Sequence, residues 1–149
     1  MNHDIRLKLG PCGISCEKCF AFSAGSIKKN STELKNALGN FDIYAERFTK
    51  QLNEPIFLKY SEFKILLNYF SEVKCRGCRL DGCKIFPHCK VKGCSAERNI
   101  DYCFQCDSFP CDNTGFDEHL KHRWISIQNR MKETGVENFY NETKDKARY

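Results

Sequence analysis

The chain has 149 residues, 11 of them cysteine, and a formal net charge of +5. Its hydrophobic fraction of 41% and aromatic fraction of 13% exclude a globally disordered protein, because such chains lack the apolar side chains for a core. No apolar run approaches the roughly 18 residues of a membrane span. The first residues also lack the apolar stretch of a secretory signal. We therefore expect a cytoplasmic protein with no membrane partner.

The high cysteine content indicates metal binding. Thiols stay reduced in the cytoplasm, where dense cysteine patterns are typical of metal ligands rather than of disulfides. The odd number of 11 would also leave one thiol unpaired under full oxidation. Free redox thiols and disulfides are the alternative interpretations.

The predicted elements begin with residues 5–9, whose alternating apolar and basic side chains predict a short strand or an extended lead-in. Three helices are predicted next, at about residues 30–38, 42–53 and 55–70. Their apolar side chains recur at intervals of three and four residues, as in Leu34, Leu66 and Leu67. We expect these apolar stripes to pack into a core.

Residues 74–113 differ from the helices on either side. Gly, Pro and Cys recur there and no apolar periodicity lasts, so something other than a hydrophobic core must order this segment. Thr114 and Asp117 then form a capping-box pattern that opens a long helix, which Gly135 ends. Residues 136–143 predict one further short helix, followed by a charged tail.

These elements predict a single domain over residues 1–149. Its fold class is mainly α with little strand, a helical scaffold carrying a cysteine-rich, loop-dominated zinc-binding segment. Its parts are an N-terminal cysteine cluster (1–29), helices (30–73), the cysteine-rich metal-binding segment (74–113), C-terminal helices (114–143) and a tail (144–149).

The cysteines include three C-x2-C pairs, a spacing that lets two thiolates from one turn bind the same ion. The pairs are Cys16/Cys19, Cys75/Cys78 and Cys103/Cys106. All the cysteines are candidate metal ligands: Cys12, Cys16, Cys19, Cys75, Cys78, Cys83, Cys89, Cys94, Cys103, Cys106 and Cys111. No other residue is assigned to a site, and no catalytic residue is predicted.

A count of ligands predicts two to three zinc ions, because tetrahedral zinc takes four ligands. Three full sites need one ligand beyond the cysteines, and His88, His3 or water could supply it. Grouping by neighbours gives Cys75, Cys78, Cys83 and Cys89; then Cys94, Cys103, Cys106 and Cys111; then an incomplete set of Cys12, Cys16 and Cys19. Interleaved sites, in which distant pairs share an ion, are the alternative.

The first three cysteines also favour a second cofactor. Their C-x3-C-x2-C spacing is that of the radical S-adenosylmethionine enzymes, in which three thiolates hold a [4Fe–4S] cluster. The helical pattern of residues 20–73 and the lack of a glycine-rich cofactor strand argue against that enzyme class. A [4Fe–4S] cluster at Cys12, Cys16 and Cys19 is nevertheless kept as the alternative cofactor.

Three motifs, taken in order, resemble those of a known protein family. They are Cys12-Gly13-x2-Cys16-x2-Cys19-Phe20-Ala21, then Cys75-x-Gly77-Cys78-Arg79, then Cys103-Phe104-x-Cys106-x2-Phe109-Pro110-Cys111. Over residues 10–113 the chain resembles the domain of unknown function 3795 family, which comprises small prokaryotic cysteine-rich proteins thought to bind zinc. The resemblance implies a soluble metal-binding protein with no assigned activity.

Three functions fit these features. The favoured one is a zinc-binding module with structural four-cysteine sites and a protein partner of unknown identity. An iron–sulfur or thiol redox protein is the second. A nucleic-acid-binding zinc module is the third, suggested by 7 basic against 4 acidic residues in 74–111.

Nucleic acid is the less favoured partner, because four thiolates on one Zn²⁺ leave a charge of −2 that this basicity would offset. Enzyme activity is also less favoured. The sequence contains no H-E-x-x-H motif, no phosphate-binding loop and no G-x-S-x-G motif.

Overall fold

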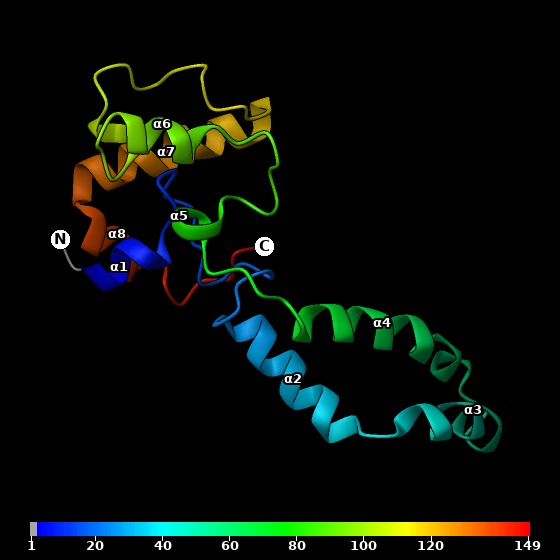
Figure 1. Ribbon diagram of the computed structural model, residues 1–149. Coiled ribbons are helices and arrows are strands. Elements are labelled where there is room, and N and C mark those ends of the chain that lie inside the picture. Colours follow the sequence, from blue (N-terminus) through cyan, green and yellow to red (C-terminus); the bar gives the residue numbers. More distant parts are fainter. Residues whose placement is uncertain (1–2) are drawn as a thin grey trace. The chain divides into compact units, whose positions relative to one another are not determined.

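The structure is a computed structural model that describes residues 3–149, except for the side chain of His3 (Figure 1). The proposal of His3 as a ligand therefore falls outside the described residues. The described chain is mainly helical, without a sheet, and an isolated bridge joins Leu9 to Ser15. This confirms the predicted mainly α fold class. No helix in the described part of the chain has the length and apolar character needed to cross a membrane.

The elements follow one another in a simple order. They are α1 (His3–Lys8), α2 (Ser26–Leu38), α3 (Phe41–Gln51), the 3-10 helix η1 (Pro55–Lys59), α4 (Tyr60–Ser71), α5 (Cys78–Asp81), α6 (Val91–Glu97), the 3-10 helix η2 (Cys103–Gln105), α7 (Glu118–Thr134) and α8 (Val136–Thr143). Two compact units result. The hairpin unit is Phe20–Lys74, and the cysteine unit joins the chain up to Cys19 with Cys75–Tyr149. This division rests on contacts and does not test whether either unit folds alone. The single domain therefore stays a prediction.

In the hairpin unit, α2 packs against α4 and α3 packs on η1. An ion pair joins Lys35 of α2 to Glu72 after α4 at 3.2 Å. Gly39, which has a φ of +51°, caps the C-terminal end of α2. The three predicted helices are thus confirmed, with α2 beginning at Ser26 rather than near residue 30.

The apolar stripes of the hairpin unit do not form the closed core that was expected. Leu67 is buried, but Leu34 is 44% exposed and Leu66 is 57% exposed. The reason is geometric, because a pair of helices covers only one side of each. The prediction of core packing is therefore wrong for Leu34 and Leu66.

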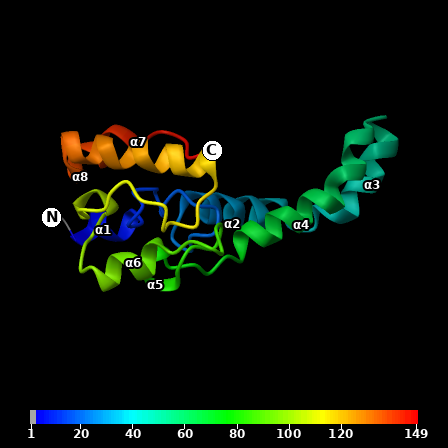
Figure 2. The same ribbon diagram turned by 90° about the horizontal axis from the view of Figure 1, so that it is seen from above.

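The cysteine unit is built on α7, which buries Leu120, Trp124, Gln128 and Met131 on one face. In Figure 2, α7 and α8 lie on one side of this unit and α5 and α6 on the other. The long predicted helix is confirmed, and it begins at Glu118. Its N-cap is Asp117, whose carboxylate accepts a hydrogen bond from the Leu120 backbone N–H at 2.8 Å.

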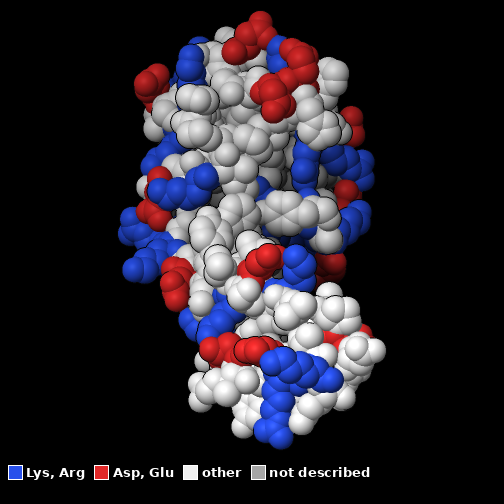
Figure 3. Space-filling view, turned by 90° about the vertical axis from the view of Figure 1, so that its right-hand side faces the viewer, with Lys and Arg blue, Asp and Glu red and all other residues white. Residues whose placement is uncertain are grey.

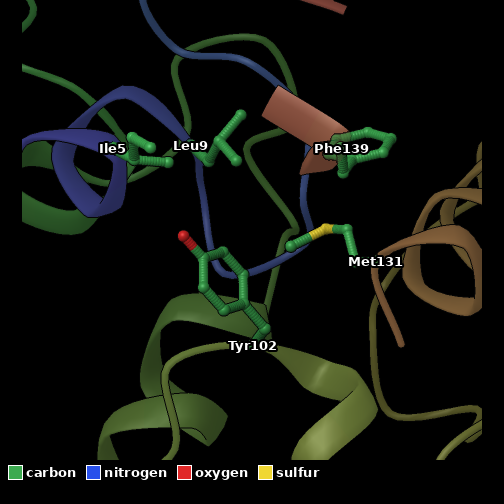
Figure 4. Close-up of a cluster of buried hydrophobic side chains, with 5 residues drawn as sticks. All are labelled: Ile5, Leu9, Tyr102, Met131 and Phe139. Carbon is green, nitrogen blue, oxygen red and sulfur yellow. The ribbon is translucent and has the colours of Figure 1, made fainter. Parts of the chain in front are cut away.

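The main apolar cluster joins elements that are distant in sequence. Figure 4 shows its members, which come from α1 and the residue after it, from the turn before η2, and from α7 and α8: Ile5, Leu9, Tyr102, Met131 and Phe139. This cluster explains why residues 5–9 are not the predicted strand. Ile5 and Leu9 are four residues apart, so helix α1 brings both to the buried side. An ion pair between Asp4 and Lys8 at 3.1 Å supports the same helix.

The N-terminal cysteine loop touches α7 directly at Gly13. This glycine has a φ of +80°, and a Cβ added to it would lie 2.4 Å from Ile127 Cγ2 and 2.7 Å from Met131 Sδ. The neighbouring Pro11 carbonyl accepts a hydrogen bond from the Gln128 side chain at 3.2 Å. The close approach of this loop to the helix therefore requires glycine.

We predict that Gly13→Ala destabilises the fold by about 2–4 kcal/mol, because it adds overpacking to the cost of a positive φ. Gly135→Ala is the matched control, since Gly135 has a φ of +82° and no atom within 4 Å of an added Cβ. We expect the control to cost only about 1 kcal/mol. Urea unfolding followed by circular dichroism measures both, and equal losses would contradict the packing argument.

Candidate metal centre

Thiols from separate segments meet at the start of α5. The Cys78 thiol interacts by hydrogen bonding with the sulfurs of Cys16 and Cys83. The Cys78 backbone N–H also donates to Cys16 Sγ at 3.3 Å. We call Cys16, Cys78 and Cys83 the first thiol cluster.

Hydrogen bonding shifts the pKa values within the first thiol cluster. The interactions of Cys78 with Cys16 and Cys83, together with its burial, raise the pKa of Cys78. The same hydrogen bonds lower the pKa of Cys16 to about 7 and that of Cys83 to about 6. The Phe86 backbone N–H adds a hydrogen bond to Cys83 Sγ at 3.3 Å. The lowered pKa values of Cys16 and Cys83 favour the thiolate, which is the form that binds metals.

Cys19 and Cys75 lie beside this cluster. Burial is the main cause that raises the pKa of Cys75, and the charges of Asp81, Cys19 and Cys16 raise it further. The Gly77 backbone N–H donates to Cys75 Sγ at 3.4 Å. The pair Cys16/Cys19 thus lies near the pair Cys75/Cys78, which is the interleaved arrangement rather than the grouping by neighbours.

Four further cysteines line a small cavity. Its volume is about 20 Å³, enough for about one water molecule. The apolar side chains of Val91, Phe109 and Trp124 form part of its wall. The cysteines come from α6, η2 and the chain that follows η2: Cys94, Cys103, Cys106 and Cys111. These four, called the second thiol cluster, are one of the sets obtained by grouping neighbours.

Nitrogen donors surround the second thiol cluster. Arg98 Nη1 donates a hydrogen bond to Cys106 Sγ at 3.3 Å, and the guanidinium also interacts with Cys94. The buried Trp124 Nε1 has no hydrogen-bond partner of ordinary geometry, yet its N–H acts on Cys103. Burial raises the pKa of Cys103 to about 11, and this N–H lowers it in part. The Arg98 guanidinium and the Trp124 indole N–H can therefore stabilise negative charge on the sulfurs of this cluster.

Cys12 and Cys89 lie between the two clusters. Burial raises the pKa of Cys12 to about 12, and the charges of Cys16, Cys89 and Cys103 raise it further. Cys12 also belongs to the apolar cluster around Trp124. Burial likewise raises the pKa of Cys89. Cys12 interacts electrostatically with cysteines of both clusters, and Cys89 interacts with Cys83 of the first.

The donor chemistry fits zinc or iron, whereas a finished ligand geometry is not present. Among the residues that the structure describes, no three Cys, His, Asp or Glu side chains are already arranged to hold an ion. His88 is exposed and does not line the cavity of the second thiol cluster. Sulfur atoms that converge with N–H donors around them are the pattern that soft or borderline metals prefer.

Two side chains that the sequence analysis did not single out position the cysteine loops. Arg79, whose side chain is 9% exposed, donates to the backbone carbonyls of Arg6 at 2.7 Å and Asp101 at 2.7 Å. Gln128 accepts from the Phe104 backbone N–H at 2.8 Å, beside Cys103. Gln128 follows Trp124 by four residues, so both lie on the same face of the helix. This spacing is the sequence signal for Gln128.

The comparison with protein families supports the resemblance seen in the sequence. The model described as "Protein of unknown function (DUF3795)" matches residues 8–116. This range contains every cysteine and ends before α7 begins at Glu118. No curated protein and no solved structure matches the chain.

We predict a distinct pH profile for the Cys83 thiol in metal-free, reduced protein. Because Cys78 stabilises its thiolate, alkylation by iodoacetamide should reach half its maximum near pH 6 and fall below that pH as the sulfur gains a proton. The fully buried Cys12 should stay unreactive at neutral pH. Peptide mass spectrometry measures both. Cys78→Ala is the control, and it should raise the pKa of Cys83, because it removes the largest cause that lowers it. A wild-type midpoint at the ordinary value of 9.0 would contradict the lowered pKa.

Proposed function

We propose that this chain, which belongs to the DUF3795 family, is a cytoplasmic zinc-binding protein that serves as a binding module for a partner protein. Its zinc ions are structural. They hold the loops of the cysteine unit and take no part in a reaction. The observation that carries this proposal is the second thiol cluster, where four sulfurs surround one small cavity.

The second thiol cluster supplies the ligand set that structural zinc sites use. Four cysteine thiolates bind the ion tetrahedrally, with zinc–sulfur distances of about 2.3 Å. When bound, zinc supplies a charge of +2 that holds the four thiolates together. Arg98 and Trp124 would then donate to ligand sulfurs, as outer-shell groups do in metal sites.

The first thiol cluster would hold a second zinc ion. Cys16, Cys78 and Cys83 would provide three sulfurs, and Cys75, which interacts electrostatically with Cys16 and Cys19, or Cys19 itself would complete the set. Backbone N–H groups already donate to the sulfurs of Cys16 and Cys83. Hydrogen bonds of this kind stabilise thiolates and so favour metal binding.

An iron–sulfur protein is the second candidate, because clusters of thiolates suit both metals. The specific alternative places a [4Fe–4S] cluster on Cys12, Cys16 and Cys19. The contacts of Cys16 favour zinc instead, because its hydrogen bonds are with Cys78, outside that set. Cys12 is also enclosed in the apolar cluster around Trp124.

Nucleic-acid binding is less favoured because the three arginines of the cysteine segment have partners within the protein. Arg76 pairs with Asp81 at 2.7 Å, Arg79 bonds to backbone carbonyls, and Arg98 bonds to Cys106. On the face drawn in Figure 3, acidic and basic side chains are interspersed. A nucleic-acid site needs a continuous basic patch.

We predict two to three zinc ions per chain when the protein is purified without oxygen and analysed for metals. Cys103→Ser should lose about one of them, because it removes a ligand from a four-sulfur site. Ser108→Ala is the matched control, since this exposed residue lies in the same loop and carries no thiol.

Two results would contradict the proposal. Iron with acid-labile sulfide would establish the redox alternative. Zinc at wild-type stoichiometry in Cys103→Ser would show that the second thiol cluster is not a site.

A further inference from the structure

A cavity of about 220 Å³ lies in the cysteine unit, apart from both thiol clusters. The loop after α1, helix α7 and the chain at and after the end of α8 enclose it. Its walls include the apolar side chains of Leu9, Ile127 and Phe139. Four cationic side chains also line it: Lys18, Arg123, Lys146 and Arg148.

These cations are held by backbone carbonyls and not by carboxylates. Lys18 Nζ donates to the carbonyl oxygens of Thr143 and Lys146, the latter at 2.7 Å. Arg148 donates to the carbonyl of Ser15. A carbonyl oxygen fixes the direction of a cationic group but leaves its charge unneutralised.

The remaining two cations have still fewer partners. Arg123 Nη2 donates to the Arg148 carbonyl at 3.2 Å. The Lys146 side chain has no hydrogen bond or ion pair among the described residues. In the same part of the chain, no Asp or Glu lines the cavity, and none of the four cations has a carboxylate oxygen within 4.0 Å. Four like charges therefore share one cavity without a counter-charge on its walls.

Arg148 is a partial exception. Its charge also acts on the thiols of Cys16 and Cys83, so thiolates of the first cluster offset part of it. Lys18, Arg123 and Lys146 carry the rest of the excess charge. Clefts lined by one sign of charge, with low-dielectric walls, concentrate counter-ions.

We propose that this cavity binds a small organic anion, an apolar body that carries a phosphate or carboxylate group. The volume is that of about seven water molecules and lies below the roughly 300 Å³ of common drug-sized pockets. The apolar walls suit a short hydrocarbon body. The cations suit the head group, because guanidinium and ammonium donors make charge-assisted hydrogen bonds to either oxyanion.

The test uses three probes on the full, metal-loaded chain: butyl phosphate, pentanoate and neutral 1-butanol. Titration is followed by ¹H–¹⁵N NMR, and we expect shifts around Ile127 and Phe139 with at least one anion and none with 1-butanol. Whichever anion binds more tightly identifies the head group. Failure of both anions to bind at millimolar concentration overturns the proposal, as does equal binding of 1-butanol.

A pair of charge reversals separates a site from general attraction to a basic surface. Lys146→Glu should weaken binding at least about tenfold, because it replaces a charge-assisted donor with a like charge. Lys144→Glu is the matched control, since Lys144 is exposed in the same tail but does not line the cavity. We expect it to bind as the wild type does. Equal weakening in both variants, or no weakening in Lys146→Glu, overturns the site.

Discussion

Residues 75–111 must hold a defined shape with hardly any apolar core of their own. They contain eight cysteines, but Val91 and Tyr102 are their only large apolar side chains in the buried class. The loops are instead tied down by polar contacts, such as those of Arg79 and Gln128 with backbone groups. The cysteine sulfurs lie where these polar contacts bring the loops together. Metal binding would add free energy of folding at the points where apolar burial is smallest.

Helix α7 connects the cysteine chemistry to the rest of the unit. Its inner face supplies Trp124 to the second thiol cluster, Gln128 to the cysteine loops and Met131 to the apolar cluster. The family match ends before this helix. The cationic cavity also depends on α7, α8 and the tail, so this chain builds both features with residues that the family model does not cover.

Local patterns predicted local structure well. Gly135 ends α7 and residues 136–143 form α8 as expected, because caps and apolar periodicity act within a few residues. The features that could not be predicted from local patterns depend on long-range contacts. Ile5 lies in helix α1 and Leu9 directly follows it, because a distant cluster buries both side chains. The contact between Cys16 and Cys78 spans 62 residues, so spacing alone could not choose between neighbouring and interleaved sets. Metal identity depends on the ligand geometry, which spacing does not fix either.

X-ray absorption at the zinc edge, on protein purified without oxygen, tests the metal assignment most directly. We expect a first shell of about four sulfur atoms near 2.3 Å, with little nitrogen or oxygen, because the converging donors are thiols. A shell dominated by nitrogen and oxygen would contradict four-sulfur sites. An iron signal with iron–iron scattering would replace structural zinc with a redox cluster.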